Sequence, residues 1–110
     1  MIQKLTLLLL LISFNAWTQD RLIVDVRTIP EWKTKSIKGA QLIEWQNILL
    51  PINEMDIPRD HEILLFCRSG NRSGKAKKIL EENGYTNIKN LGSIEEAGLY
   101  LNLPVLINNQ

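Results

Sequence analysis

The chain has 110 residues, of which 13 are basic, 12 are acidic and 45% are hydrophobic. This length allows one domain, and this composition is typical of a globular protein rather than of a fibrous or disordered one. The near balance of charge leaves no strong basic field that would attract nucleic acid or an anionic membrane over long range. We therefore expect no nucleic-acid partner, and any anion recognition must be local.

The first nineteen residues differ from the rest of the chain. Leu5 to Ile12 is apolar apart from one threonine, but it is too short to span a bilayer, which needs about 20 helical residues. A lysine before this run and small residues such as Ala16 and Thr18 after it are typical of a secretory signal peptide. We expect residues 1–19 to be that signal and residues 20–110 to be the mature domain. The mature protein would be periplasmic or otherwise exported, and it would not contact the membrane after the signal is removed. The alternative is a buried N-terminal helix, although the run has no polar face.

The rest of the chain alternates between strand and helix patterns. Strands are predicted where short aliphatic or β-branched runs occur, at 22–26, 41–43, 62–67 and 87–91. Helices are predicted where apolar residues recur at helical spacing or follow a capping signal, at 30–35, 44–50, 73–83 and 93–101. This alternation predicts an α/β domain with a mainly parallel sheet, flanked by helices and joined by right-handed crossovers.

Short signals mark the predicted ends of these elements. We expect Pro51 to close the second helix, Gly84 to cap the third and Gly92 to form a turn. Two helix starts show the spacing of a capping box, in which the first and fourth residues bond reciprocally: Thr28 with Glu31, and Ser93 with Glu96.

Cys67 is the only cysteine, so it has no internal disulfide partner. It ends the most apolar predicted strand, and the carboxyl ends of parallel strands are where such sheets place their working sites. The segment CRSGNRS, 67–73, then leads directly into a helix. A short turn of this kind points backbone N–H groups inward, and Gly70 can adopt the positive φ that the turn needs. We predict that this loop forms an anion cradle around the thiol.

The cradle should favour the thiolate form of Cys67. The dipole of the following helix and the charges of Arg68 and Arg72 all stabilise a negative sulfur. Such surroundings lower a cysteine pKa from about 8.5 to roughly 3.5–7.5, which makes the sulfur a nucleophile at neutral pH. The alternative is an inert, buried cysteine. A glycine and two arginines within five positions of Cys67, directly before a helix, argue against that alternative.

The segment CRSGNRSGKA, 67–76, resembles the active-site loop and following helix of the rhodanese family. Further segments resemble the family's first strand, the start of its second strand and its late helix, strand and turn: IVDVR at 23–27, IKGA at 37–40 and GYTNIKNLGS at 84–93. The resemblance covers nearly all of the expected mature chain, and it is closest to small periplasmic thiosulfate sulfurtransferases of the phage-shock type.

The resemblance implies a single rhodanese-like domain that transfers a sulfane sulfur from thiosulfate, or a similar small anionic donor, to a thiol, cyanide or another acceptor. Cys67 would attack that sulfur, release sulfite and hold a persulfide. The expected substrate-binding residues are those of the loop: Arg68, Ser69, Gly70, Asn71 and Arg72. The residues expected to brace the loop are Asp25, Arg27 and Ser73. Asp25 would pair with Arg72 or Arg27, unless it is merely a solvated carboxylate at a strand end.

The sequence departs from the family pattern at two positions outside the loop. Ser36 stands where members often have histidine, and Ser93 stands where they often have a second glycine. His61, the only histidine, precedes a strand and is expected at the surface. No metal-ligand spacing is present, so we expect no metal and no cofactor, and we expect a monomer.

Two other functions use a similar cysteine. A cysteine phosphatase or arsenate reductase also places cysteine and arginine around an oxyanion, but related phosphatases hold five residues between them, whereas only four separate Cys67 from Arg72. The smaller loop suits a sulfur atom. A persulfide carrier that receives sulfur from a partner protein, without turning over thiosulfate, would use the same cysteine, and the sequence leaves this alternative open.

Overall fold

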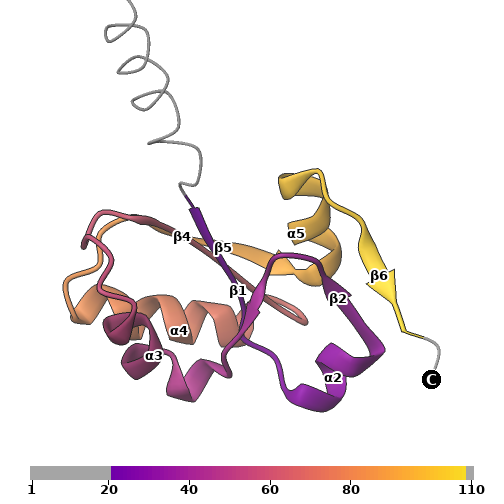
Figure 1. Ribbon diagram of the computed structural model, residues 1–110, viewed down its shortest axis with the longest axis horizontal. Helices are drawn as coiled ribbons and strands as arrows, with labels where there is room; N and C mark the ends of the chain where they lie inside the picture. Colours follow the sequence, from indigo (N-terminus) through magenta and orange to yellow (C-terminus); the bar gives the residue numbers. More distant parts are fainter. Residues whose placement is uncertain (1–20, 109–110) are drawn as a thin grey trace, which may run out of the picture.

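The structure is a computed structural model that describes residues 21–108 (Figure 1). The predicted signal peptide and residue 20 lie outside this range, so both the signal and the domain boundary stay predictions. The described elements follow one another along the chain as β1 (Arg21–Asp25), α2 (Ile29–Thr34), β2 (Lys35–Ile37), β3 (Gln41–Leu42), η2 (Trp45–Asn47), α3 (Leu49–Glu54), β4 (Glu62–Cys67), α4 (Asn71–Glu82), β5 (Ile88–Ser93), α5 (Ile94–Leu101) and β6 (Val105–Ile107).

The central sheet has the strand order β3-β1-β4-β5, and its neighbouring strands are all parallel. The predicted single α/β domain with a mainly parallel sheet is therefore confirmed. The pairing of Asp25 with Phe66 places the carboxyl ends of β1 and β4 side by side, next to Cys67. A second, antiparallel pair of β2 and β6 was not predicted, because each strand has only three residues and carries no alternating pattern. Ser36 lies in this pair, opposite Leu106.

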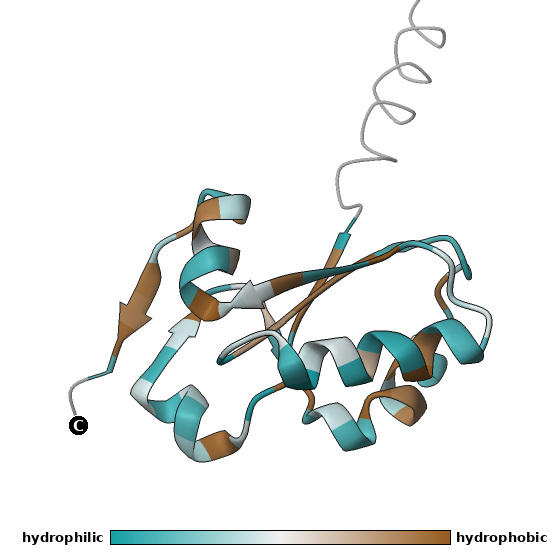
Figure 2. Ribbon diagram, turned by 180° about the vertical axis from the view of Figure 1, so that it is seen from behind, coloured by the Kyte–Doolittle hydropathy of each residue, from teal (hydrophilic) through white to brown (hydrophobic). Residues whose placement is uncertain are grey.

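Strand β4 is buried on both faces, which explains why its sequence is a continuous apolar run. Ile63, Leu65 and Cys67 face one apolar cluster, shared with residues of α3 and α4. Leu64 and Phe66 face the other, shared with residues of α5. The sheet therefore lies between two helical layers, and Figure 2 shows the hydrophobic colouring of its central strands. Cys67 belongs to the layer that contains α4.

Several helix ends follow the predicted signals. Thr28 and Ser93 both cap their helices, and both capping boxes are complete. Gly84 follows α4 and has φ +93°. Its N–H donates to the carbonyl of Glu81, and the N–H of Tyr85 donates to the carbonyl of Leu80. This paired bonding at a left-handed glycine is a Schellman motif, so the predicted cap is confirmed. Helix α4 begins at Asn71, two residues before the prediction.

The predicted helix at 44–50 and the predicted turn at Gly92 are wrong. Residues 45–47 form the short η2, and α3 runs separately from Leu49 to Glu54. Pro51 does not close a helix but is the third residue of α3, within the first turn, where its missing N–H has no intrahelical acceptor to lose. Gly92 does not end β5 in a turn: the strand continues to Ser93, and its pairing with β4 is irregular between Leu65 and Cys67. At this irregularity Gly92 adopts φ +91°. The strand bulges here rather than ending.

An ion pair joins α2 to the start of α4. Arg72 donates to both carboxylate oxygens of Glu31, at 2.8 and 3.0 Å, and Glu31 also closes the capping box with Thr28. The hydrogen bonds from Arg72 are the main cause that lowers the pKa of Glu31 to about 2, although partial burial opposes them. The carboxylate therefore fixes the first turn of α4 against α2.

We predict that Gly92→Ala destabilises the fold more than Gly39→Ala. Both glycines have positive φ, so alanine at either costs about 1–2 kcal/mol in backbone strain. A Cβ at Gly92 would lie 2.2 Å from Oε1 of Glu96, whereas one at Gly39 would meet no atom within 4 Å. Glu96 would have to leave its capping box, at a further cost of about 1 kcal/mol. Urea unfolding measures both variants, and equal losses would contradict the bulge geometry.

We predict that Glu31→Gln lowers the free energy of unfolding at pH 7 by about 1–2 kcal/mol. Because the folded pKa of Glu31 is below the unfolded value of 4.5, its contribution is complete above about pH 4.5 and is lost as the pH falls toward 2. The difference in free energy of unfolding between wild type and Glu31→Gln should therefore become smaller from pH 5 to pH 3, as measured by urea titrations. Glu81→Gln, an exposed carboxylate on α4, is the control and should show a much smaller gap. A constant Glu31→Gln gap across this range would refute the role of the ion pair.

Candidate functional site

The side chain of Cys67 points into the loop that follows it. The N–H of Gly70 donates to Sγ at 2.9 Å, and Oγ of Ser73 lies 3.4 Å from the same sulfur. Burial raises the pKa of Cys67, but the Ser73 hydroxyl and the backbone N–H groups of Ser73, Ser69 and Gly70 outweigh burial, so the pKa lies below its ordinary value. We call these donors the sulfur ring. The expected cradle of amides is therefore present around the sulfur.

The sulfur ring also covers the sulfur. Cys67 has 0% of its surface exposed, and it forms part of the apolar cluster beneath α4. Arg68 and Ser69, which follow it, are exposed. A small molecule therefore reaches Sγ only when part of the loop is displaced. The burial belongs to the alternative that the sequence left open, an inert cysteine, whereas the contact with the Gly70 N–H belongs to the predicted cradle.

The two loop arginines have different environments. Arg72, an expected substrate-binding residue, holds Glu31 in the ion pair described above. Arg68 forms no salt bridge within residues 21–108 and lines a pocket of about 250 Å³. The other residues that line this pocket come mainly from α2, its flanks and the start of α5: Arg27, Glu31, Thr34, Lys35, Ile94 and Glu95. Asn71, also expected to bind substrate, is exposed.

Asp25 and Arg27 form a buried ion pair at the end of β1. Two hydrogen bonds join the side chains, from Nε to Oδ1 at 2.9 Å and from Nη2 to Oδ2 at 2.8 Å, and Asp25 is 1% exposed. Of the two expected partners Asp25 has Arg27 and not Arg72, because Arg72 reaches α2 instead. Arg27 also donates to the carbonyl of Lys35 at 2.7 Å. The pair therefore ties β1 to β2, and its proposed bracing of the cysteine loop is not a direct contact.

Two residues that contact the site were not predicted from the sequence, Asn90 and Glu31. Asn90 accepts a hydrogen bond from Ser73 at 2.6 Å and donates one to the carbonyl of Gly70 at 2.9 Å, although nothing in its local sequence marks it. Glu31 had been assigned only to a helix cap. Its contact with Arg72 spans 41 residues and has no local signal.

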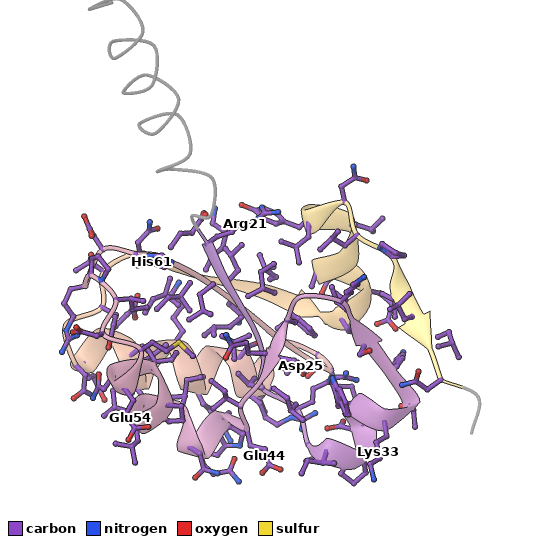
Figure 3. All side chains as sticks on the ribbon, viewed as in Figure 1. Arg21, Asp25, Lys33, Glu44, Glu54 and His61 are labelled. Carbon is purple, nitrogen blue, oxygen red and sulfur yellow. The ribbon has the colours of Figure 1, made fainter. Side chains whose placement is uncertain are left out.

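Two other chemically active groups, Arg21 and His61, lie away from the sulfur. Figure 3 shows Asp25 at one end of β1, while Arg21 and His61 lie toward the opposite end of the sheet. His61 is partly exposed, near the surface position expected for it. Within the described residues, no group of three or more His, Cys, Asp or Glu side chains could hold a metal ion. None of the helices described is both long and apolar enough to cross a membrane.

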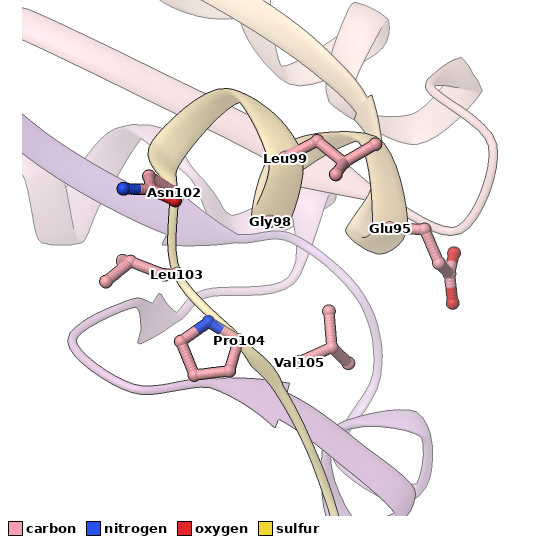
Figure 4. Close-up of a pocket in the computed structure, with 7 residues that line it drawn as sticks. All are labelled: Glu95, Gly98, Leu99, Asn102, Leu103, Pro104 and Val105. Carbon is pink, nitrogen blue, oxygen red and sulfur yellow. The ribbon is translucent and has the colours of Figure 1, made fainter.

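A second pocket, of about 550 Å³, lies between α5 and the chain that leads into β6 (Figure 4). Most of its lining is aliphatic or backbone, and Glu95 is its one charged residue. It contains no nucleophile, whereas the loop after β4 combines a nucleophile with anion-binding donors. The loop is therefore the candidate active site.

Comparison with known proteins shows which family this chain is similar to. A sequence profile described as "Rhodanese-like domain" matches residues 11–97. A sulfurtransferase from Allochromatium vinosum is 38% identical over 74 residues, which cover 67% of each chain. The thiosulfate sulfurtransferase PspE of Escherichia coli is 28% identical over 76 residues, which cover 69% of this chain and 73% of that protein.

Solved structures agree. The structure titled "rhodanese with anions from E. coli" superposes with a TM-score of 0.69 at 25% identity, over 80% of this chain and 99% of that one. A rhodanese-like domain protein from Staphylococcus aureus superposes with a TM-score of 0.59 at 29% identity, over 78% and 82% of the two chains. Fold, cysteine loop and sequence matches agree: this chain belongs to the rhodanese-like domain family and has the fold of its sulfurtransferases.

Proposed function

We propose that this protein is a thiosulfate sulfurtransferase that carries sulfur as a persulfide on Cys67. The observation that supports this most is the set of hydrogen-bond donors directed at Sγ, from Gly70 and Ser73. Such donors stabilise a negative sulfur before attack and again when the sulfur is the leaving atom. The E. coli relative is a thiosulfate sulfurtransferase, which is consistent with this donor.

The proposed reaction has two steps that balance without an added oxidant or reductant. The Cys67 thiolate attacks the sulfane sulfur of thiosulfate, the bond between the two sulfur atoms breaks, and sulfite leaves with its electron pair. A thiol or cyanide then attacks the outer sulfur of the persulfide, and the bond to Sγ breaks. The electron pair returns to Sγ, which restores the thiolate. With cyanide the product is thiocyanate.

The pocket beside the loop provides a place for the anionic donor. Arg68 lines it without an ion-pair partner among the described residues, and Lys35 adds a second cation near its Glu95 partner. Loop displacement would bring a donor in this pocket to the sulfur. Arg68 therefore has the best position among the loop arginines to hold a substrate oxyanion, while Arg72 is held by Glu31.

The covered sulfur favours a second candidate, a persulfide carrier. A partner protein could open the loop on docking and deliver sulfur directly, so that free thiosulfate would not be needed. Both functions use Cys67 as a persulfide and differ in the donor. We also propose, from the apolar N-terminal run, that residues 20–110 act after export. The expected monomer stays a separate proposal.

We predict that the protein forms thiocyanate from thiosulfate and cyanide, and that Cys67→Ser abolishes the activity, because no other cysteine is present to accept sulfur. A colorimetric thiocyanate assay measures this. Glu82→Ala, at an exposed residue at the far end of α4, is the control and should retain most of the activity, because it lies outside the cysteine loop. A wild type with no turnover that gains the mass of one sulfur atom from a protein donor would favour the carrier instead.

A further inference from the structure

Asn90, in β5, contacts the sulfur ring at two residues. Its Oδ1 accepts from the hydroxyl of Ser73 at 2.6 Å and from the N–H of Gly92 at 3.0 Å. Its Nδ2 donates to the carbonyl of Gly70 at 2.9 Å. Gly70 donates its N–H to Sγ of Cys67, and Oγ of Ser73 lies 3.4 Å from the same sulfur. Asn90 therefore does not touch the sulfur itself, but it contacts both residues, Ser73 and Gly70, that do.

These contacts fix the orientation of the Asn90 amide. A reversed amide would place its NH2 group against the N–H of Gly92 and its oxygen against the carbonyl of Gly70, so both contacts would become repulsive. Oδ1 therefore faces Ser73. Because Oδ1 carries no proton, the hydrogen between these two oxygens, 2.6 Å apart, belongs to the hydroxyl of Ser73.

The single hydroxyl proton of Ser73 cannot serve two acceptors. Oγ lies 2.6 Å from Oδ1 of Asn90 and 3.4 Å from Sγ of Cys67. When Cys67 is a thiol, the hydroxyl can donate to Asn90 and accept from S–H. When Cys67 is a thiolate, the sulfur has no proton to donate, and its lone pairs repel those of Oγ. This repulsion is removed only if the hydroxyl turns its proton toward the sulfur.

We propose that Asn90 is a positioning residue that holds the Ser73 hydroxyl as a switchable donor, directed to Asn90 beside the thiol and to Sγ beside the thiolate. The switch is a rotation: the thiol proton leaves to water, and Ser73 keeps its own proton. The Gly92 N–H remains on Oδ1 after the rotation, so Asn90 is not left without a donor. The value of the switch for turnover rests on the proposed function, but the switch itself does not.

This geometry predicts a coupling between two substitutions. In the wild type, the hydroxyl must give up Asn90 before it can stabilise the thiolate, so its net effect on the pKa of Cys67 is reduced. In Asn90→Ala, no competing acceptor remains, and the hydroxyl acts on the thiolate in full. The loop keeps an anchor in this variant, because the Gly70 carbonyl also accepts from the N–H of Gly74 at 3.0 Å. Asn90 is exposed, so its truncation leaves no buried cavity.

The test is a double-mutant cycle on the full chain with wild type, Ser73→Ala, Asn90→Ala and the double variant. Because Cys67 is the only cysteine, the rate of iodoacetamide alkylation against pH gives its pKa without interference. We expect Ser73→Ala to raise this pKa in both backgrounds, and by at least about half a unit more in the Asn90→Ala background, which is about threefold in the thiolate fraction. Equal increments, or a smaller increment without Asn90, would overturn the proposal.

Two further variants make the result specific. Asn87→Ala changes another exposed asparagine, three positions before Asn90 in the chain. In this background, Ser73→Ala should raise the pKa of Cys67 by the same amount as it does in the wild type. If Asn90→Ala does not fold by circular dichroism, Asn90→Ser replaces it, because the serine side chain is too short to reach Ser73. The alkylation assay does not depend on enzyme turnover. A larger Ser73→Ala increment in the Asn90→Ala background, in a protein that forms no thiocyanate, would therefore reject the proposed function but support the switch. Thiocyanate formation without coupling would do the reverse.

Discussion

The hydrogen bonds that converge on Sγ of Cys67 are the interaction on which the rest of the site depends. The apolar strand β4 delivers the sulfur to the edge of the sheet, and the loop that follows turns its N–H groups back onto that sulfur. Burial alone would raise the pKa of the thiol, whereas the amides and the Ser73 hydroxyl reverse that effect. The donors therefore favour the ionised form of a covered sulfur, and the proposed function requires the loop to open before a sulfur donor can reach it.

Close packing of two glycines allows this loop to rest on β5. A Cβ on Gly70 would lie 3.3 Å from the Cα of Gly92, and both glycines have positive φ. The bulge at Gly92 lies between Asn90, which bonds to the loop, and Ser93, which caps α5. Serine at position 93, which departs from the family's usual glycine, therefore has a clear structural role here.

Features that depend on neighbouring residues could be predicted from the sequence, and features that depend on distant residues could not. The strand at 62–67, both capping boxes and the amide ring around Cys67 follow from local patterns. The Glu31–Arg72 pair joins residues that are far apart in the chain, and the sequence offered two arginines for Asp25 without choosing between them. Pro51 was misread because a proline is tolerated equally after a helix and within its first turn. The coverage of the sulfur also depends on packing that no motif encodes.

The most direct test of this account is the pH dependence of Cys67 alkylation by iodoacetamide in the unmodified protein. The donors around Sγ predict a midpoint below about 8.5, the value of an ordinary cysteine, so that at pH 8.5 the rate already exceeds half of its plateau value. Because the loop covers the sulfur, the plateau rate should also be lower than that of a small thiolate of equal pKa. A midpoint at or above about 8.5 would contradict the account, since it would show that burial outweighs the hydrogen bonds.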